Sequence, residues 1–115
     1  MKRLLPLLAL VALALAGCGQ KQDTLNPPAG SRQSLTLMLD WFPNADHVGI
    51  YQAQAEGDFS RAGLDVRIQT PSDPAAPLRL LAAGRVDMAI SYEPELLLAR
   101  DQNLPLASVA ALVQE

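Results

Sequence analysis

Two short clusters of aromatic and hydrogen-bonding side chains stand about fifty residues apart in this 115-residue chain. The first cluster comprises Asp40, Trp41, Asn44 and His47, and the second comprises Tyr92 and Glu93. Each cluster follows an apolar run of strand length. Aromatic faces beside carboxylate, amide and imidazole groups are suited to holding a flat polar ring. We therefore expect the two clusters to face each other across one cleft.

The aromatic side chains would supply the two faces of this cleft. Trp41 is the only tryptophan, and its ring can lie over a ligand while the indole N–H finds a partner. The alternative is that Trp41 plugs the end of the sheet as part of the core. Its polar neighbours Asp40 and Asn44 favour binding over this alternative. With Tyr92 as the second face, a flat ring would be held between two aromatic side chains.

Each polar side chain also has a purely structural explanation. Asn44 can donate and accept along a ring edge, but it is equally suited to cap a helix. His47 lies in the first turn of a predicted helix, where the macrodipole favours neutral imidazole, so it can contact the ring or be an ordinary surface histidine. Glu93 can accept a charge-assisted hydrogen bond from an amino group, although carboxylates are common at helix starts.

Several kinds of chemistry lack the residues that they need. One histidine and one cysteine give no metal site of the His/Cys type, and the sequence has no GxGxxG motif, phosphate loop or nucleophile elbow. The chain carries 9 Lys and Arg against 12 Asp and Glu and has no basic cluster, so nucleic acid is not an expected partner. We expect a binding site without catalytic residues, metal or cofactor.

Strand-like and helix-like segments alternate from residue 35 onwards. Strands are predicted at 35–39, 64–68, 86–90 and 106–113. Helices are predicted from Asn44 or Asp46 to Gly57, from Pro74 to Gly84, and from Pro94 to the break at 103–105. The first helix is expected to bury Val48, Tyr51 and Ala55, which recur at helical spacing.

This alternation predicts an α/β fold, a mainly parallel sheet with helices on both faces. Ligands of such sheets bind beyond the carboxyl ends of the strands. Three polar segments fall at that edge: 40–41, 71–73 and 91–93. The fold therefore predicts that the two clusters share one edge of the sheet.

The first thirty-four residues read as an export signal and a tether. Met1-Lys2-Arg3 is a cationic start, and the apolar run that follows is shorter than the roughly 20 residues of a membrane span. Residues 15–18, Leu-Ala-Gly-Cys, resemble the lipobox of bacterial lipoproteins, which implies a lipid on Cys18. We expect a signal peptide at 1–17, lipidated Cys18 with a flexible tether at 18–34, and one domain at 35–115.

Longer segments of the chain resemble the substrate-binding lipoproteins of ABC importers that bind pyrimidine precursors of thiamine, a branch related to the fungal pyrimidine synthases. The matching segments are LDWFPNADHVGIYQAQAEGDF at 39–59, GLDVRIQTPSDP at 63–74, AAGRVDMAISYEPELLLAR at 82–100 and NLPLASVAALVQ at 103–114. The resemblance is specific because D-W-x-P-N-x-x-H-x-G and S-Y-E-P-E occur together. It covers nearly all of the chain after residue 35.

The resemblance implies a periplasmic-binding-protein-like fold of type II that closes on an aminopyrimidine, such as hydroxymethylpyrimidine or its formylaminomethyl analogue. Trp41 and Tyr92 would be its stacking pair, and Asp40, Asn44, His47 and Glu93 its polar contacts. The implied partners are an ABC permease and its ATPase, and the implied form is a monomer, exported and lipid-anchored to the membrane surface. Relatives of the same fold bind sulfonate, taurine or nitrate, and this is the alternative; the acidic and aromatic loops here favour a neutral or cationic heterocycle.

The fungal relatives are enzymes that carry pyridoxal phosphate on a lysine and consume a histidine. Where the resemblance places that lysine and histidine, this chain has Ser91 and Glu95, and no lysine follows Lys21. We therefore expect a protein that is not an enzyme. The family's proteins are longer, so we also expect only the N-terminal part of lobe 1 here, as a fragment or a truncated product that binds weakly or not at all.

Overall fold

A computed structural model describes residues 30–113 of the chain, and the expected signal peptide, Cys18 and most of the expected tether lie outside these residues. The centre of the fold is a parallel sheet of β1 (Gln33–Met38), β2 (Leu64–Gln69) and β3 (Met88–Ala89), in the order β2-β1-β3. β1 begins two residues earlier than expected because Gln33 pairs with Leu64 in the register of β2. The parallel α/β sheet predicted from the sequence is confirmed.

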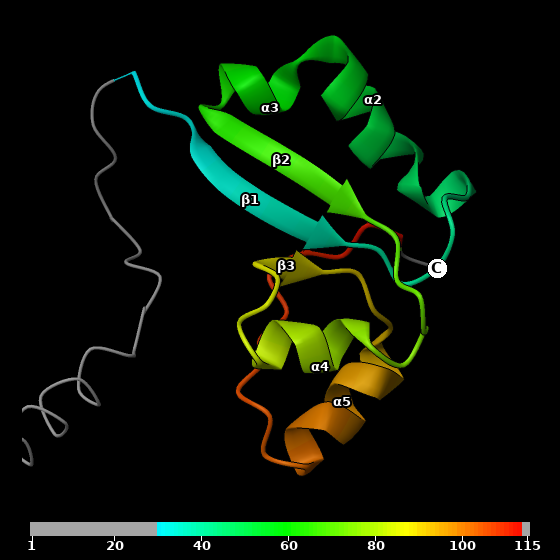
Figure 1. The fold of residues 1–115 in the computed structure, drawn as a ribbon. Coiled ribbons are helices and arrows are strands. Elements are labelled where there is room, and N and C mark those ends of the chain that lie inside the picture. Colours follow the sequence, from blue (N-terminus) through cyan, green and yellow to red (C-terminus); the bar gives the residue numbers. More distant parts are fainter. Residues whose placement is uncertain (1–29, 114–115) are drawn as a thin grey trace, which may run out of the picture.

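Helices lie on both sides of this sheet (Figure 1). They are the 3-10 helix η1 (Ala45–His47), α2 (Val48–Glu56), α3 (Asp58–Arg61), α4 (Pro77–Ala82) and α5 (Glu93–Asp101). α2 and α3 connect β1 to β2, and α4 connects β2 to β3. Figure 1 shows α2 and α3 on one side of the strands and α4 and α5 on the other. Among residues 30–113, no helix is long and apolar enough to span a bilayer.

Left-handed residues end the helices where the sequence predicts. Gly57 ends α2 with φ 76°, and its N–H donates to the carbonyls of Ala53 and Gln54. Gly84 follows α4 with φ 65°, and Asn103 follows α5 with φ 62°. Asparagine tolerates this conformation better than most residues, which explains why α5 stops there without a glycine.

The core lies between the β1–β2 ladder and the α2–α3 side. Leu37, Leu39 and Ile50 are its buried members, and Leu39 is fully buried at 0 % exposure. Of the three positions of α2 expected to be buried, Tyr51 packs against this core, whereas Val48 is 66 % exposed and Ala55 is exposed as well. The buried residue of α2 is Ile50.

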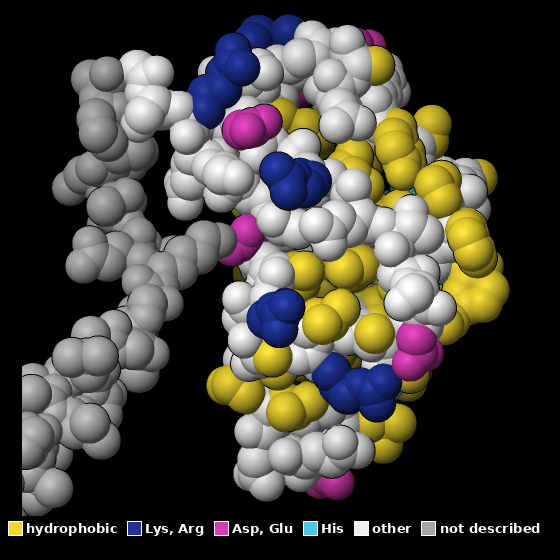
Figure 2. Space-filling model, in the orientation of Figure 1, with side chains coloured by type: hydrophobic (Ala, Val, Ile, Leu, Met, Phe, Trp, Pro, Cys, Tyr) yellow, Lys and Arg dark blue, Asp and Glu magenta, His cyan; other side chains and the backbone are white. Residues whose placement is uncertain are grey.

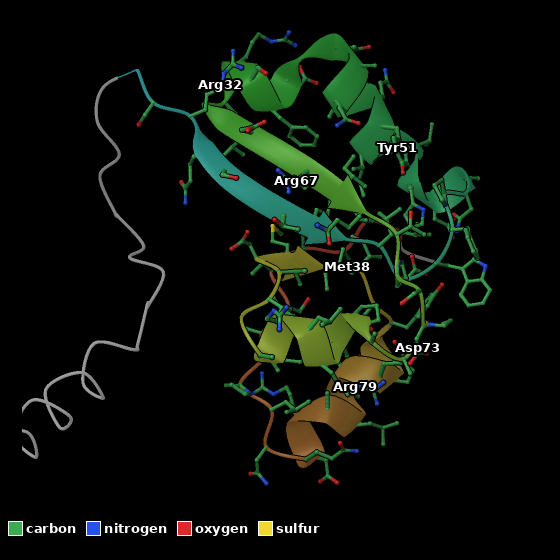
Figure 3. All side chains as sticks on the ribbon, in the orientation of Figure 1. Arg32, Met38, Tyr51, Arg67, Asp73 and Arg79 are labelled. Atoms are coloured by element: carbon green, nitrogen blue, oxygen red, sulfur yellow. The ribbon has the colours of Figure 1, made fainter. Side chains whose placement is uncertain are left out.

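The segment that precedes α4 is a turn rather than the first helical turn that Pro74 predicts. Asp73 accepts the Ala75 N–H on its side chain at 2.9 Å, and its carbonyl accepts the Ala76 N–H at 2.9 Å. The helix then begins at Pro77. Asp73 and Arg79 lie close together at this turn, with Oδ2 and Nη2 3.3 Å apart (Figure 3).

The predicted strand at 106–113 is wrong. Within the described residues 104–113 there is no strand; Leu106 is buried, but its N–H donates to the carbonyl of Leu104 at 2.8 Å, so the chain bends there. β3 has only two residues and offers too short an edge for a fourth strand to pair with. The apolar residues that follow, among them Val109 and Leu112, stay exposed. Figure 2 shows hydrophobic side chains over much of the centre and right of one face.

Candidate functional site

The strand order places the two sequence clusters at one point of the sheet. From β1 the chain crosses to β2 on one side of it, and from β2 it returns past β1 to β3 on the other side. β1 and β3 are therefore neighbours whose following loops diverge, which is the topological switch point where ligands of such sheets bind. The loop after β1 carries Asp40 and Trp41, and the loop after β3 carries Ser91 and Tyr92.

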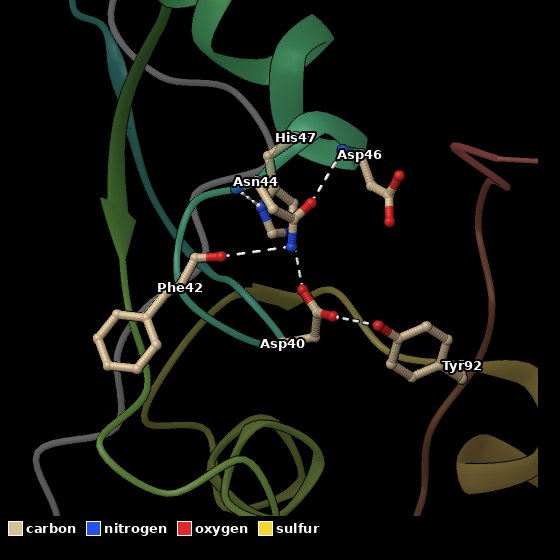
Figure 4. A network of polar contacts seen from close by, with 6 residues as sticks. All are labelled: Asp40, Phe42, Asn44, Asp46, His47 and Tyr92. Carbon is tan, nitrogen blue, oxygen red and sulfur yellow. Dashed lines mark hydrogen bonds and ion pairs between the residues drawn. The ribbon is translucent and has the colours of Figure 1, made fainter.

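A buried carboxylate joins these two loops. Asp40 lies just beyond β1 and is 8 % exposed. Its Oδ1 is 2.7 Å from Nε2 of His47, and its Oδ2 accepts the Tyr92 hydroxyl at 2.6 Å (Figure 4). The carboxylate is thus held by His47, 7 residues further along the chain, and by Tyr92, 52 residues further along.

The backbone at the start of the helical segment determines which ring nitrogen of His47 is a hydrogen-bond acceptor. The backbone N–H of Asn44 donates to Nδ1 of His47 at 3.3 Å, so Nδ1 is an acceptor and carries no proton. The proton of a neutral ring then lies on Nε2 and points to Asp40. The side chain of Asn44 accepts the N–H of Asp46 at 2.9 Å, so Asn44 is the N-cap of η1 (Figure 4).

The hydrogen bonds keep Asp40 ionised. Burial alone would raise the pKa of this carboxyl, but the hydrogen bonds from Tyr92 and His47 outweigh burial and leave the pKa below its ordinary value of 3.8. The same contact raises the pKa of the Tyr92 hydroxyl above 10.0, because the neutral phenol donates to the carboxylate and the phenolate would be repelled by it. At neutral pH the contact between Asp40 and Tyr92 therefore joins a carboxylate to a neutral phenol.

Asp40 lines a small pocket at this edge of the sheet. The pocket has a volume of about 110 Å³. Its walls come from three segments: Asp40 and Trp41 after β1, Pro74 and Pro77 around the turn before α4, and Ile90, Tyr92 and Glu95 after β3. Trp41 and Tyr92 are 50 % and 57 % exposed, so both rings keep free surface for contact. Two of the lining side chains are acidic, and the others are aromatic or apolar.

The structure brings together three of the six predicted site residues in the pocket wall: Asp40, Trp41 and Tyr92. His47 is 1 % exposed and lies behind Asp40, so it is neither a pocket residue nor a surface histidine. Asn44 is the helix cap described above. Glu93 begins α5 and does not line the pocket.

Other residues of the pocket were not predicted from the sequence. Glu95 lies one helical turn after Ser91, whose hydroxyl donates to Glu95 Oε2 at 2.6 Å. Its signal is the spacing of four residues, which places both side chains on one face of the start of α5. Pro74 belongs to the loop after β2, which the sequence places at the same edge, and Pro77 is the first residue of α4. Phe42 packs its ring edge-on against Trp41, with centroids 5.8 Å apart.

The described residues thus form an α/β domain with a three-stranded parallel sheet and an aromatic and acidic pocket at its switch point. Residues 44–115 match the family described as NMT1/THI5 like, and the chain belongs to this family. The partial periplasmic-binding-protein-like fold that the sequence predicts agrees with this membership.

Relatives in this family carry names of two kinds. The chain is 40 % identical to the formylaminopyrimidine-binding protein of Halalkalibacterium halodurans, over 93 % of this chain and 32 % of that protein. It is 42 % identical to a putative thiamine biosynthesis protein of Haemophilus influenzae, over 77 % of this chain and 28 % of that protein. It is also 35 % identical to a 4-amino-5-hydroxymethyl-2-methylpyrimidine phosphate synthase of Saccharomyces cerevisiae, over 74 % of this chain and 25 % of that protein.

The chain spans about a third of the length of these relatives or less. One relative is named for binding, one for a biosynthetic pathway and one as an enzyme. Membership of the family alone is therefore compatible with binding and with catalysis.

Proposed function

We propose that this chain forms part of a solute-binding protein that holds an amino-substituted pyrimidine against Trp41, Tyr92 and Asp40. The observation that carries this proposal is the ionised carboxylate of Asp40 in the wall of a pocket that both aromatic rings share. A flat ring can stack on the exposed face of either aromatic side chain. An amino group on that ring can donate to the carboxylate through a charge-assisted hydrogen bond.

The charge of the pocket favours this ligand over the anions that other proteins of similar fold bind. Asp40 and Glu95 line the pocket, and no arginine among the described residues does. A sulfonate or nitrate placed there would meet like charge, whereas an amino-pyrimidine would meet acceptors for its N–H groups. The name of the Halalkalibacterium halodurans relative supports the same class of ligand.

The enzymatic alternative rests on the relatives named as synthases. A Schiff base with a cofactor needs an amine, and the chain has no lysine after Lys21. Ser91, in the loop after β3, and Glu95, in the first turn of α5, are joined by a hydrogen bond to each other. These residues favour ligand binding over catalysis in the segment that the chain provides.

We also propose the setting in which such binding would be used. The Leu-Ala-Gly-Cys segment at 15–18 supports export and attachment of a lipid to Cys18. An exported protein that is lipid-anchored to the membrane surface would pass its ligand to an ABC permease driven by its ATPase. Labelling of cells with a radioactive fatty acid tests the anchor: wild-type protein would be labelled, and label retained after Cys18→Ala would refute it.

The binding proposal is tested through Trp41, which is the only tryptophan. Titration with hydroxymethylpyrimidine is expected to quench its fluorescence in a saturable way, with a Kd of about 1 mM, or about −4 kcal/mol. We expect this weak affinity because the pocket is small compared with the roughly 300 Å³ at which ordinary ligand pockets begin. The comparison ligands are nitrate and taurine, a zwitterion that carries a sulfonate, and neither is expected to give a saturable change.

A variant pair separates stacking from general effects on the fold. Tyr92→Ala removes one aromatic wall together with the hydroxyl that donates to Asp40, whereas Tyr92→Phe removes the hydroxyl alone. Tyr92→Ala is expected to weaken the interaction about tenfold more than Tyr92→Phe does, since stacking on an aromatic ring contributes roughly 1 kcal/mol or more. Leu98→Ala removes an exposed apolar side chain on α5 that does not line the pocket, and it is expected to change nothing. Equal quenching by taurine, or no saturable quenching by the aminopyrimidine, would refute the proposal.

A further inference from the structure

His47 is the one predicted site residue that is fully enclosed. Its side chain is 1 % exposed, and both of its ring nitrogens already have partners, the Asn44 N–H and the Asp40 carboxylate. It does not line the pocket, because Asp40 stands between the ring and the pocket. A ligand in this pocket would therefore not touch His47.

The hydrogen bonds around His47 have one direction. The chain begins at the backbone N–H of Asn44, which can only donate, and this N–H occupies Nδ1 of His47. Nε2–H then donates to Oδ1 of Asp40, and the Tyr92 hydroxyl donates to Oδ2 (Figure 4). Because the first donor cannot reverse, every later group has a single role.

We propose that His47 is a positioning residue: as the neutral Nε2–H tautomer it orients the Asp40 carboxylate, and through Asp40 it fixes the Tyr92 ring as a wall of the ligand pocket. The effect on the ligand rests on the proposed function, whereas the effect on Asp40 and Tyr92 belongs to the unliganded chain. A carboxylate has about four acceptor positions, and the two internal donors leave capacity for a ligand N–H.

This role explains why the arrangement spans two loops. The side chain of Tyr92 is 57 % exposed, and the cap of α5 lacks a side-chain hydrogen bond. The hydrogen bond from the Tyr92 hydroxyl to Asp40 therefore restrains a ring that is otherwise largely in solvent. The direction of this hydrogen bond is set by the orientation of the carboxylate, which His47 holds from the buried side.

The first test needs no ligand. His47 is the only histidine, so a sample labelled with 15N-histidine gives one imidazole spectrum. At pH 7 we expect the proton on Nε2 and an unprotonated Nδ1. A proton on Nδ1, in the other neutral tautomer or in an imidazolium, would overturn the proposal, because Nδ1 could then not accept the Asn44 N–H.

The second test compares two variants of His47 that each place another side chain at this buried position. His47→Gln keeps an N–H donor and an oxygen acceptor in a neutral side chain, whereas His47→Leu keeps bulk and removes both. The readout is the pKa of Tyr92, followed by NMR of 13C-labelled tyrosine. The charged groups near its hydroxyl are Asp40, Asp46 and Glu95, and none of them is changed.

We expect the pKa of Tyr92 to stay raised in His47→Gln and to fall towards 10.0 in His47→Leu, since a carboxylate released from His47 no longer holds the hydroxyl. An unchanged Tyr92 pKa in a folded His47→Leu protein would overturn the proposal. A purely structural role would instead lower stability and leave this pKa in place. If His47→Leu does not fold, the tautomer of the wild-type ring still tests the proposal.

The third test reads the ligand site with hydroxymethylpyrimidine as the probe. His47→Leu is expected to weaken the affinity about tenfold and His47→Gln less than about threefold, because only the former loses a hydrogen bond to the charged Asp40. Equal losses in both variants would argue against positioning through the donor. If the wild-type protein does not bind the probe, the proposed function fails, while the tautomer and the Tyr92 titration still decide the role of His47.

Discussion

Replacing Asp40 with asparagine tests whether an ionised carboxylate holds the two loops of the site together. Two donors reach Asp40, Nε2–H of His47 at 2.7 Å and the Tyr92 hydroxyl at 2.6 Å. Asparagine has nearly the same size, and its oxygen can accept from His47 while its NH₂ group donates to the hydroxyl oxygen of Tyr92. Both hydrogen bonds then lose the charge of the carboxylate. The free energy of unfolding is expected to fall by about 2 kcal/mol at pH 7.

The same variant changes the acid dependence of stability. The pKa of Asp40 in the folded protein lies below its ordinary value of 3.8, so the unfolded state binds more protons in this range. The contribution of Asp40 is fully present above pH 3.8 and is lost as the pH falls through the folded pKa. Asp40→Asn has no such proton to bind, so the gap in stability between wild type and variant is expected to narrow below pH 3.8.

Urea unfolding followed by Trp41 fluorescence measures this gap at a series of pH values. Asp65→Asn is the matched control, because it makes the same chemical change at an exposed position on β2. The control is expected to stay within about 0.5 kcal/mol of wild type. Wild-type stability in Asp40→Asn at pH 7, or a gap that does not change with acid, would refute the role given to the carboxylate.

Three further predictions concern the ring, the helix end and the core. Trp41→Ala is expected to abolish aminopyrimidine binding measured by calorimetry. Its free energy of unfolding in urea is expected to change by less than about 1 kcal/mol, since the ring is half exposed. Retained affinity would remove Trp41 from the site. Gly57→Ala is expected to lower stability by about 1–2 kcal/mol because φ is 76°, whereas Gly49→Ala, inside α2 with free space around it, is expected to raise stability slightly; the same sign for both would contradict the conformational explanation. Leu39→Ala is expected to cost about 2–5 kcal/mol in thermal or urea unfolding and the exposed Leu98→Ala close to nothing, and similar costs would show that Leu39 is not the centre of the core.

Patterns within short segments predicted much of this fold. The alternation of 64, 66 and 68 with polar neighbours gave β2, and the residues that accept a left-handed backbone gave the helix ends at Gly57 and Asn103. The predictions that depended on distant partners did worse. An apolar run at 106–113 has strand composition, but a strand also needs an edge to pair with, and the two residues of β3 do not provide one.

The site shows the same division between local and distant information. That Asp40, Trp41 and Tyr92 share one edge follows from the strand pattern and the switch-point rule. The sequence did not show that His47 would be buried behind Asp40, because this depends on η1 turning the ring inward under the Asn44 N–H. Glu93 and Glu95 are both carboxylates, so the sequence does not show which of them lines the pocket. Only the rotation of α5 about its axis places Glu95 in the pocket wall.

The size and the polarity of the pocket separate recognition from affinity. A pocket of about 110 Å³ surrounds only part of a heterocycle, and the relatives of this chain are about three times as long as the part that it matches. The groups proposed to recognise the ligand nevertheless lie together: the charge of Asp40 is held by two donors, and Asp40, Trp41 and Tyr92 line one pocket. Affinity grows with the surface that is buried, whereas preference for a ring with N–H donors depends on the carboxylate. We therefore expect the preference for an aminopyrimidine over taurine to persist at millimolar affinity. The variant Asp40→Asn is expected to lose this preference while the ligand still stacks on Trp41.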